Sequence, residues 1–395
     1  MNMHRFIIAV IILTAFFSIS RAKEYTSFTP GKEWLADDGK HINAHACGIL
    51  FEDGVYYWFG ECKNGIGISL YTSTDLYNWK NGGLVFKPDG SVSKDIEKGC
   101  VMERPKVVKC EKTGKYVLWF HLELNGQGYS AARVATCVAD KITGPYEFVR
   151  SFRPNGNMSR DQTIFVDDDG TGYHFYSSRE NYDMRLHTMT DDFLDATKED
   201  KMIFKSGAHR EAPAVFKYKK KYYLITSGCT GWDPNEARWD VTENIWQQPW
   251  TTKSNPCTGA NASKTFNGQS TFVLKVPGYD DAFIFIADIW KQNNLAGSKY
   301  IWLPITIKSN GDIQIPWRDS WTLEGAFGPK TAVLTREDFT VNRTVPVFPA
   351  AVINDRFTLS GQRAGDDGAN ASLPVVVHRA STRSTVLQMR LGKHR

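Results

Sequence analysis

The stretch HREAPAVFKYKKKYYLITSG, residues 209–228, decides the fold because its pattern recurs along the chain. It begins with a carboxylate at Glu211, continues with alternating apolar residues, turns at a lysine cluster and returns as a second alternating run. Such alternation is typical of a β-hairpin with one buried face. MERPKVVKCEKTGKYVLWFH and SRDQTIFVDDDGTGYHFYSS begin in the same way, at Glu103 and Asp161.

Five segments align on this pattern, and successive starts are separated by 58, 58, 50 and 58 residues. They are HACGILFEDGVYYWFGE from His45, ERPKVVKCEKTGKYVLWFH from Glu103, DQTIFVDDDGTGYHFYSS from Asp161, EAPAVFKYKKKYYLITSG from Glu211, and QSTFVLKVPGYDDAFIFIAD from Gln269. Two more strand-like runs usually follow each hairpin, as in GISLYTSTDLYNWK. Four strands per repeat are typical of a propeller blade. The sequence therefore predicts an all-β chain, a five-bladed β-propeller with a short C-terminal extension.

The ends of the chain differ from the repeats. Residues 1–22 contain Arg5, an apolar stretch and a small-residue cleavage site, which predicts a signal peptide. A membrane anchor is the alternative, but a spanning helix needs about 20 apolar residues. We expect residues 23–325 to form the propeller and residues 326–395 an extension, partly β and then weakly ordered. The mature chain, without a membrane span, is expected to be periplasmic or extracellular.

The charge argues against a nucleic-acid partner, and the cysteine content argues against a structural zinc site. The net charge is +5, but residues 23–352 alone sum to −1, which gives no basic footprint for nucleic acid. The seven cysteines are odd in number and contain no CxxC motif. We therefore expect either an incomplete set of disulfides or buried thiols, rather than a structural zinc site.

The opening residues of the repeats should lie together. The innermost strand of every propeller blade lines the central channel, so equivalent positions converge in space. The sequence predicts one polar ring at a channel mouth, made by His45, Glu103, Asp161, Glu211 and Gln269. Three converging carboxylates are costly, because burial and like charges raise carboxylate pKa values. Such an arrangement favours a functional site, and paired carboxylates suit glycoside hydrolysis. A structural ion site is the alternative.

The motifs at these positions resemble glycoside hydrolase family 43 over roughly residues 30–325. HREAPAVFKYKKKYYLITS is similar to the strand that carries the general acid of the family, and SRDQTIFVDDDGTGYHFY to the strand that carries its modulating aspartate. The resemblance implies that Glu211 is the general acid and that Asp161 tunes its pKa and orients it.

One departure from the family pattern is informative. The family usually has an aspartate base at the head of the first blade, where this chain reads INAHACGILF. Together with YYWFGECK, MERPKV and FNGQSTFV, this resembles the branch of exo-β-1,3-galactanases, which implies that Gln269 positions or activates the attacking water. A neutral amide is a very weak base, so Glu103 remains a candidate, either as the base or as a group that polarises Gln269.

Further candidates surround this ring. Expected substrate-binding residues are Glu61, Arg104, Tyr129, Asn181, Trp232 and His45. Glu61 and Arg104 could equally be ion-pair members, and a lone histidine such as His45 is more often structural. No cofactor is expected. DDDGTG at 167–172 faintly suggests a calcium loop but is more simply a hairpin turn.

The sequence thus predicts an exported, inverting hydrolase that releases galactose from β-1,3-galactan, an arabinogalactan-type polysaccharide. Within the same fold, an α-L-arabinofuranosidase or a β-xylosidase is the alternative, because loop shape selects the sugar. A carbohydrate-binding propeller without catalytic activity is the alternative from another class, since the expected base is missing. A protein-interaction propeller has no need of three converging carboxylates.

Overall fold

The structure, a computed structural model, describes residues 24–63, 67–204, 206–246, 250–330, 372–377 and 385–390. The predicted signal peptide and most of the extension lie outside the described residues. In the described part, no helix has the length and apolar character that a membrane crossing requires.

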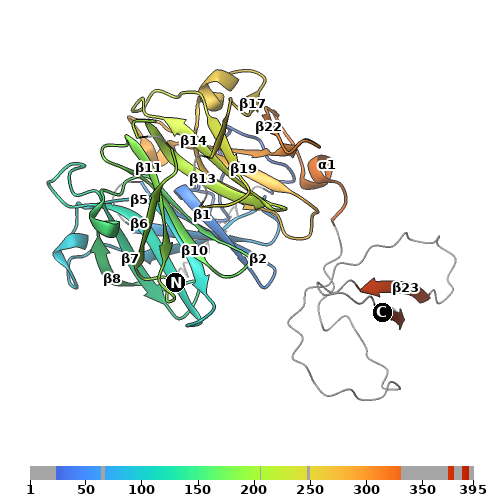
Figure 1. The fold of residues 1–395 in the computed structure, drawn as a ribbon, viewed down its shortest axis with the longest axis horizontal. Helices are drawn as coiled ribbons and strands as arrows, with labels where there is room; N and C mark the ends of the chain where they lie inside the picture. Colours follow the sequence, from blue (N-terminus) through green and yellow to red (C-terminus); the bar gives the residue numbers. More distant parts are fainter. Residues whose placement is uncertain are drawn as a thin grey trace, which may run out of the picture. The chain divides into compact units, whose positions relative to one another are not determined.

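Four antiparallel sheets of four strands follow one another along the chain (Figure 1). In each of them the strands are paired in sequence order, because tight polar turns join neighbouring strands. The first contains β1 (His45–Glu52), β2 (Val55–Cys62), β3 (Gly67–Ser73) and β4 (Lys80–Phe86). The second contains β5 (Val101–Cys110), β6 (Lys115–Glu123), β7 (Arg133–Ala139) and β8 (Glu147–Phe152). The third contains β9 (Gln162–Val166), β10 (Gly172–Ser178), β11 (Asp183–Met189) and β12 (Ala196–Met202). The fourth contains β13 (Arg210–Tyr218), β14 (Lys221–Gly228), β15 (Arg238–Thr242) and β16 (Thr251–Lys253).

The prediction of five blades is wrong. Two further sheets of three strands complete the described body, so the all-β propeller has six blades. One contains β18 (Gln269–Lys275), β19 (Phe283–Ile289) and β20 (Lys299–Pro304), and the other β17 (Cys257–Thr258), β22 (Ile313–Pro316) and β21 (Thr306–Ile307). In the last sheet β17 pairs with β22 in parallel. Because β17 and β21 are two residues long and come from either side of the fifth repeat, no hairpin pattern marks this sheet in the sequence.

The innermost strands of five of these sheets form a closed ring, and the sheet of β17, β22 and β21 contacts the fifth of them through β22 and β20. β1 contacts β5, β5 contacts β9, β9 contacts β13, β13 contacts β18, and β18 returns to β1. Tryptophans pack where the first and last repeats meet: the rings of Trp58 and Trp302 are 5.0 Å apart, and Trp34 lies 5.2 Å from Trp302. The burial of these aromatic rings stabilises the closed ring.

A short bridge ties the two ends of the propeller together. The backbone N–H of Phe28 donates to the carbonyl of Trp321, and the N–H of Trp321 donates back at 3.1 Å. Their rings stack at 4.3 Å. The helix α1 (Leu323–Phe327) follows directly.

The remaining elements are small. Within the described ranges, four 3-10 turns lie in the connections, at η1 (Lys94–Ile96), η2 (Pro154–Gly156), η3 (Ala262–Asn267) and η4 (Leu295–Gly297). A separate unit contains an antiparallel hairpin of β23 (Ser372–Val377) and β24 (Thr385–Arg390). All seven cysteines are free thiols, and five of them are buried.

Candidate active site

Irregular backbone marks the heads of two inner strands. The ladder shifts register directly after Glu103 in β5 and after Glu211 in β13. The next residue in each strand, Arg104 and Ala212, has a φ of +55°. Non-glycine residues rarely adopt this conformation, and a proline that cannot donate to the ladder follows each of them. Such bulges re-aim side chains, and strained backbone of this kind clusters at functional sites.

Arg104 connects the heads of three repeats. Its guanidinium donates to Gln269 Oε1 at 2.6 Å and lies 3.0 Å from Asp161 Oδ2. Asp161 Oδ2 also accepts the backbone N–H of Ala212 at 3.0 Å, which ties it to the strand of Glu211. Arg104 is buried, so its charge acts on these groups with little screening by water.

Glu211 is surrounded by amide donors. Gln269 Nε2 donates to its Oε1 at 2.8 Å, and Asn181 Nδ2 donates to its Oε2 at 2.9 Å. Burial and the neighbouring charge of Asp161 nevertheless raise the pKa of Glu211 to about 7, against the opposing charge of Arg104. A carboxyl group with this pKa carries a proton for much of the time at neutral pH, as a general acid must.

Glu103 lies in a different electrostatic environment. Tyr129 donates its hydroxyl to Glu103 Oε1 at 2.8 Å, His121 Nδ1 lies 3.2 Å from Oε2, and Lys63 Nζ lies 3.7 Å from Oε1. Burial opposes ionisation, but the hydrogen bond from His121 and the charge of Lys63 outweigh it. The pKa of Glu103 is therefore held well below its usual range.

The hairpins bring a second group of polar residues to the site from their far ends. The register pairs Glu103 with His121, Glu211 with Ser227, and Gln269 with Asp288. These partners were missed by the sequence analysis. Yet each stands at or next to the last residue of the same aligned hairpin, so the alignment contained the signal.

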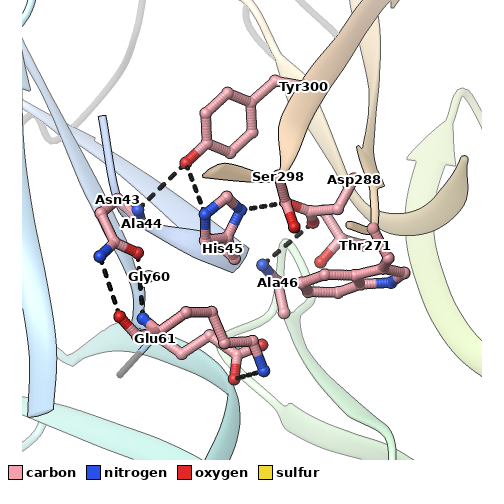
Figure 2. Close-up of polar contacts among 12 residues, drawn as sticks. Asn43, Ala44, His45, Ala46, Gly60, Glu61, Thr271, Asp288, Ser298 and Tyr300 are labelled. Atoms are coloured by element: carbon pink, nitrogen blue, oxygen red, sulfur yellow. Dashed lines mark hydrogen bonds and ion pairs between the residues drawn. The ribbon is translucent and has the colours of Figure 1, made fainter. Parts of the chain in front are cut away.

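His45 is buried behind the site. It is fully inaccessible to solvent, and its Nδ1 lies 3.0 Å from Asp288 Oδ1. Figure 2 shows it between Asp288 and Tyr300, whose ring stacks on the imidazole at 5.0 Å. Asp288 Oδ2 also accepts the N–H of Ala46 at 3.0 Å. The structure thus places His45 in a link between the first and last repeats rather than on an open surface.

Glu61 is also buried, at the end of β2, and it pairs with Lys63. Lys63 Nζ lies 2.6 Å from Glu61 Oε2. Asn43, labelled with Glu61 in Figure 2, donates to the backbone carbonyl of Lys63 and accepts its backbone N–H. Burial and the charge of Glu103 raise the pKa of Glu61, against the opposing charge of Lys63. Lys63, which the sequence analysis did not single out, therefore joins the first and second repeats electrostatically.

A cavity of about 190 Å³ adjoins Gln269. Its wall includes Trp232 and Trp290, whose rings meet edge to face at 6.3 Å. Trp232 is 47% exposed and so presents aromatic surface to solvent, as does Tyr129 beside Glu103. The cavity is also lined by Ser227, Gly231, Asp233, Pro234, Asn235, Asn267, Gly268 and Ile289. An amphipathic aromatic wall next to carboxylates suits a sugar ring.

Among the residues that the structure describes, one group has the spacing of a metal site. Ligand atoms of Glu103, His121 and Asp161 lie within 4.8 Å of one another. Burial opposes protonation of His121, but its hydrogen bonds with Glu103 and Glu123 raise its pKa to about 9. A protonated imidazole has no lone pair for a metal, so this group suits a charge network better than a cation. The DDDGTG segment forms the turn between β9 and β10, where Asp167 pairs with Lys217.

The fold and these carboxylates define the class of protein. A carboxyl group of raised pKa, an ionised carboxylate and an aromatic cavity at the inner strand heads of a propeller are the groups that glycoside hydrolysis requires. The sequence profile of Glycosyl hydrolases family 43 matches residues 48–309, and the chain belongs to this family.

Solved structures agree with this assignment. A family 43 β-1,3-galactosidase solved with galactodeoxynojirimycin is 43% identical, with a TM-score of 0.73 over 75% of this chain and 100% of that one. An exo-β-1,3-galactanase of Phanerochaete chrysosporium, solved with galactose, is 32% identical, with a TM-score of 0.69 over 76% of this chain and 69% of that one. Another, from Clostridium thermocellum, is 26% identical, with a TM-score of 0.70 over 92% and 87% of the two chains. No curated protein sequence matches the chain at comparable significance.

Proposed function

We propose that this chain is an exo-acting, inverting hydrolase that releases galactose from β-1,3-galactan. The observation that carries the proposal is the state of Glu211, a carboxyl group with a pKa of about 7 at the head of an inner strand in a family 43 propeller. The choice of galactose is supported by the similar β-1,3-galactosidase and exo-β-1,3-galactanases.

In the proposed reaction, Glu211 donates its proton to the leaving glycosidic oxygen as the bond from that oxygen to the anomeric carbon breaks. A water attacks the anomeric carbon from the opposite face, and Glu103 accepts the proton that the water loses. At neutral pH Glu103 is ionised, and Glu211, with a pKa of about 7, keeps its proton in about half of the molecules, so each group can act in its proposed role. Asp161 raises the pKa of Glu211, and Arg104 holds Asp161 and Gln269 in place. Solvent then returns both carboxyl groups to their starting states.

We further propose that the chain falls in the branch of the family that lacks the aspartate at the head of the first repeat. Its place is taken by His45, which is buried and paired with Asp288. Trp232, Tyr129 and Asn181 are proposed to contact the sugar. The first two are half exposed beside the cavity and Glu103, and the last binds Glu211.

Three other expectations remain proposals. The side chains of the site supply both proton donor and acceptor, so the proposed reaction calls for no cofactor. Residues 1–22 are proposed to direct export to the periplasm or the extracellular space, residues 23–325 to be the catalytic part, and residues 326–395 a separate extension. Amino-terminal sequencing of the secreted chain checks the first boundary.

The test is incubation of the purified protein with β-1,3-galactan and with aryl β-galactoside, α-L-arabinofuranoside and β-xyloside. Proton NMR should show galactose appearing first as the α-anomer, because inversion of a β-linkage yields that anomer. Release of a pentose alone would identify an arabinofuranosidase or xylosidase. Early appearance of the β-anomer would rule out inversion, and sugar binding without hydrolysis would identify a binding propeller.

A further inference from the structure

Gln269 uses all of its hydrogen-bonding capacity. Its Oε1 accepts from Arg104 Nη2 at 2.6 Å and from Trp290 Nε1 at 3.0 Å. Its Nε2 donates to Glu211 Oε1 at 2.8 Å and to Ser227 Oγ at 3.1 Å. A primary amide has two lone pairs and two N–H groups, so no capacity is left.

The partners also fix the orientation of the amide. A guanidinium and an indole N–H can only donate. If the amide were turned over, its NH₂ group would face two donors, and its oxygen would face Glu211. The same argument applies to the imidic tautomer, in which Oε1 carries a proton. That O–H would point at Arg104 and Trp290, neither of which can accept it.

We propose that Trp290 is a positioning residue that, with Arg104, holds Gln269 as an amide with its N–H groups directed at Glu211 and Ser227. The link to catalysis rests on the proposed function. A fully engaged amide cannot accept a proton from water, which leaves that task to a carboxylate. The N–H that faces Glu211 instead stabilises the carboxylate that Glu211 becomes after it has given up its proton.

The surroundings of Trp290 keep its indole in place. Lys63 Nζ lies 5.0 Å from the centre of the ring, and the imidazole of His45 lies 5.8 Å away. Trp290 directly follows β19, where Asp288 pairs with the buried His45. The link between His45 and Asp288 therefore anchors the segment that carries Trp290. His45, which stands at the head of the first repeat where the family usually has an aspartate, thus helps to position Trp290.

The direct test is NMR of the ¹⁵N-labelled side-chain amides, with the Gln269 signal assigned by its loss in Gln269→Ala. An amide shows two protons on one nitrogen, whereas the imidic form shows one. The proposal predicts two in the wild type. This measurement needs no turnover, so a protein that hydrolyses nothing but shows two protons would contradict the proposed function and leave the inference standing.

The matched variants are Trp290→Phe, which keeps a ring beside Lys63 but removes the N–H, and Trp232→Phe, which alters the same cavity without touching Gln269. Trp290→Phe should move the Gln269 amide signals, and kcat should fall about tenfold, as expected for one lost hydrogen bond. Trp232→Phe should leave the amide signals in place, whatever its effect on KM.

The pH profile gives a second readout. The hydrogen bond from Gln269 lowers the pKa of Glu211, so a displaced amide lets that pKa rise. The other charged or titratable groups facing Glu211 are Asp161, Arg104, Cys229 and Arg210, and neither variant changes them. In Trp290→Phe the alkaline limb of kcat/KM should therefore move to higher pH. One proton on the Gln269 nitrogen, or a Trp290→Phe variant with unchanged amide signals and an unchanged limb, would overturn the proposal.

Discussion

Glu103 and Glu211 occupy the same position in two repeats, and their pKa values are shifted in opposite directions. Each heads an inner strand, precedes a residue with φ of +55°, and is followed two positions later by proline. They differ in what the second strand of the hairpin places opposite them, an imidazole at His121 or a hydroxyl at Ser227. The pKa of Glu103 is lowered, whereas that of Glu211 is raised to about 7. The repeat therefore sets where a carboxylate lies, whereas the surrounding groups set its protonation: His121 and Lys63 for Glu103, and burial with Asp161 for Glu211.

Glu211→Gln tests the acid side of this comparison and should have the largest effect. Removing a general acid costs about 10³-fold in kcat/KM on galactan. The loss should be much smaller on an aryl β-galactoside, because a good leaving group needs little protonation. Initial rates on both substrates check this, with the exposed Glu243→Gln as the control. Equal losses on both substrates would argue against proton donation by Glu211.

Glu103→Gln tests the other side. Loss of the proton acceptor should lower kcat by about 10²-fold. Azide needs no proton acceptor, so adding it should restore cleavage and give α-galactosyl azide, which mass spectrometry and NMR detect. If azide restores nothing while galactose still binds, Glu103 holds the sugar rather than accepting a proton.

His121→Gln removes the imidazole that lowers the pKa of Glu103 and so makes it differ from Glu211. The pKa of His121 is raised to about 9, so its contribution to stability is full below pH 6.5 and is lost as the pH rises through 9. The wild type should lose about 3 kcal/mol of unfolding free energy between pH 6.5 and 9 that the variant does not lose. Urea unfolding at both pH values measures the difference. Parallel losses in the two proteins would contradict the charged state of His121.

Asp161→Asn should have the smallest effect, about fivefold on kcat/KM at pH 7. The charge of Asp161 raises the pKa of Glu211, so its removal lowers that pKa and moves the alkaline limb of kcat/KM to lower pH. Full pH profiles of the two proteins show the displacement. If the alkaline limb of kcat/KM has the same position in Asp161→Asn as in the wild type, burial rather than the charge of Asp161 sets the pKa of Glu211.

The sequence was sufficient for the strand heads but not for what surrounds them. Period and phase are local properties of the chain, so the hairpins that begin at Glu103 and Glu211 could be aligned from residues alone. The sixth sheet could not be found in this way, because strands of two residues such as β17 are too short to show an alternation of apolar and polar residues. Lys63 and Trp290 were missed because each lies just beyond a strand end, and only the closed ring brings them to Glu103 and Gln269.

The bridge between Phe28 and Trp321 affects the order in which the protein can be made. Next to it, Ser320 Oγ donates to Ser27 Oγ, across 293 residues of sequence. Contacts of this separation carry the highest loop-closure entropy in the propeller, and they require nearly the whole body to have left the ribosome. During synthesis each hairpin can pair as it emerges, but the stacked rings of Phe28 and Trp321 must come together at the end. A nascent chain stopped before Trp321 therefore lacks this bridge, and its first and last repeats must meet through the contacts of β18 with β1 and of Trp302 with Trp58.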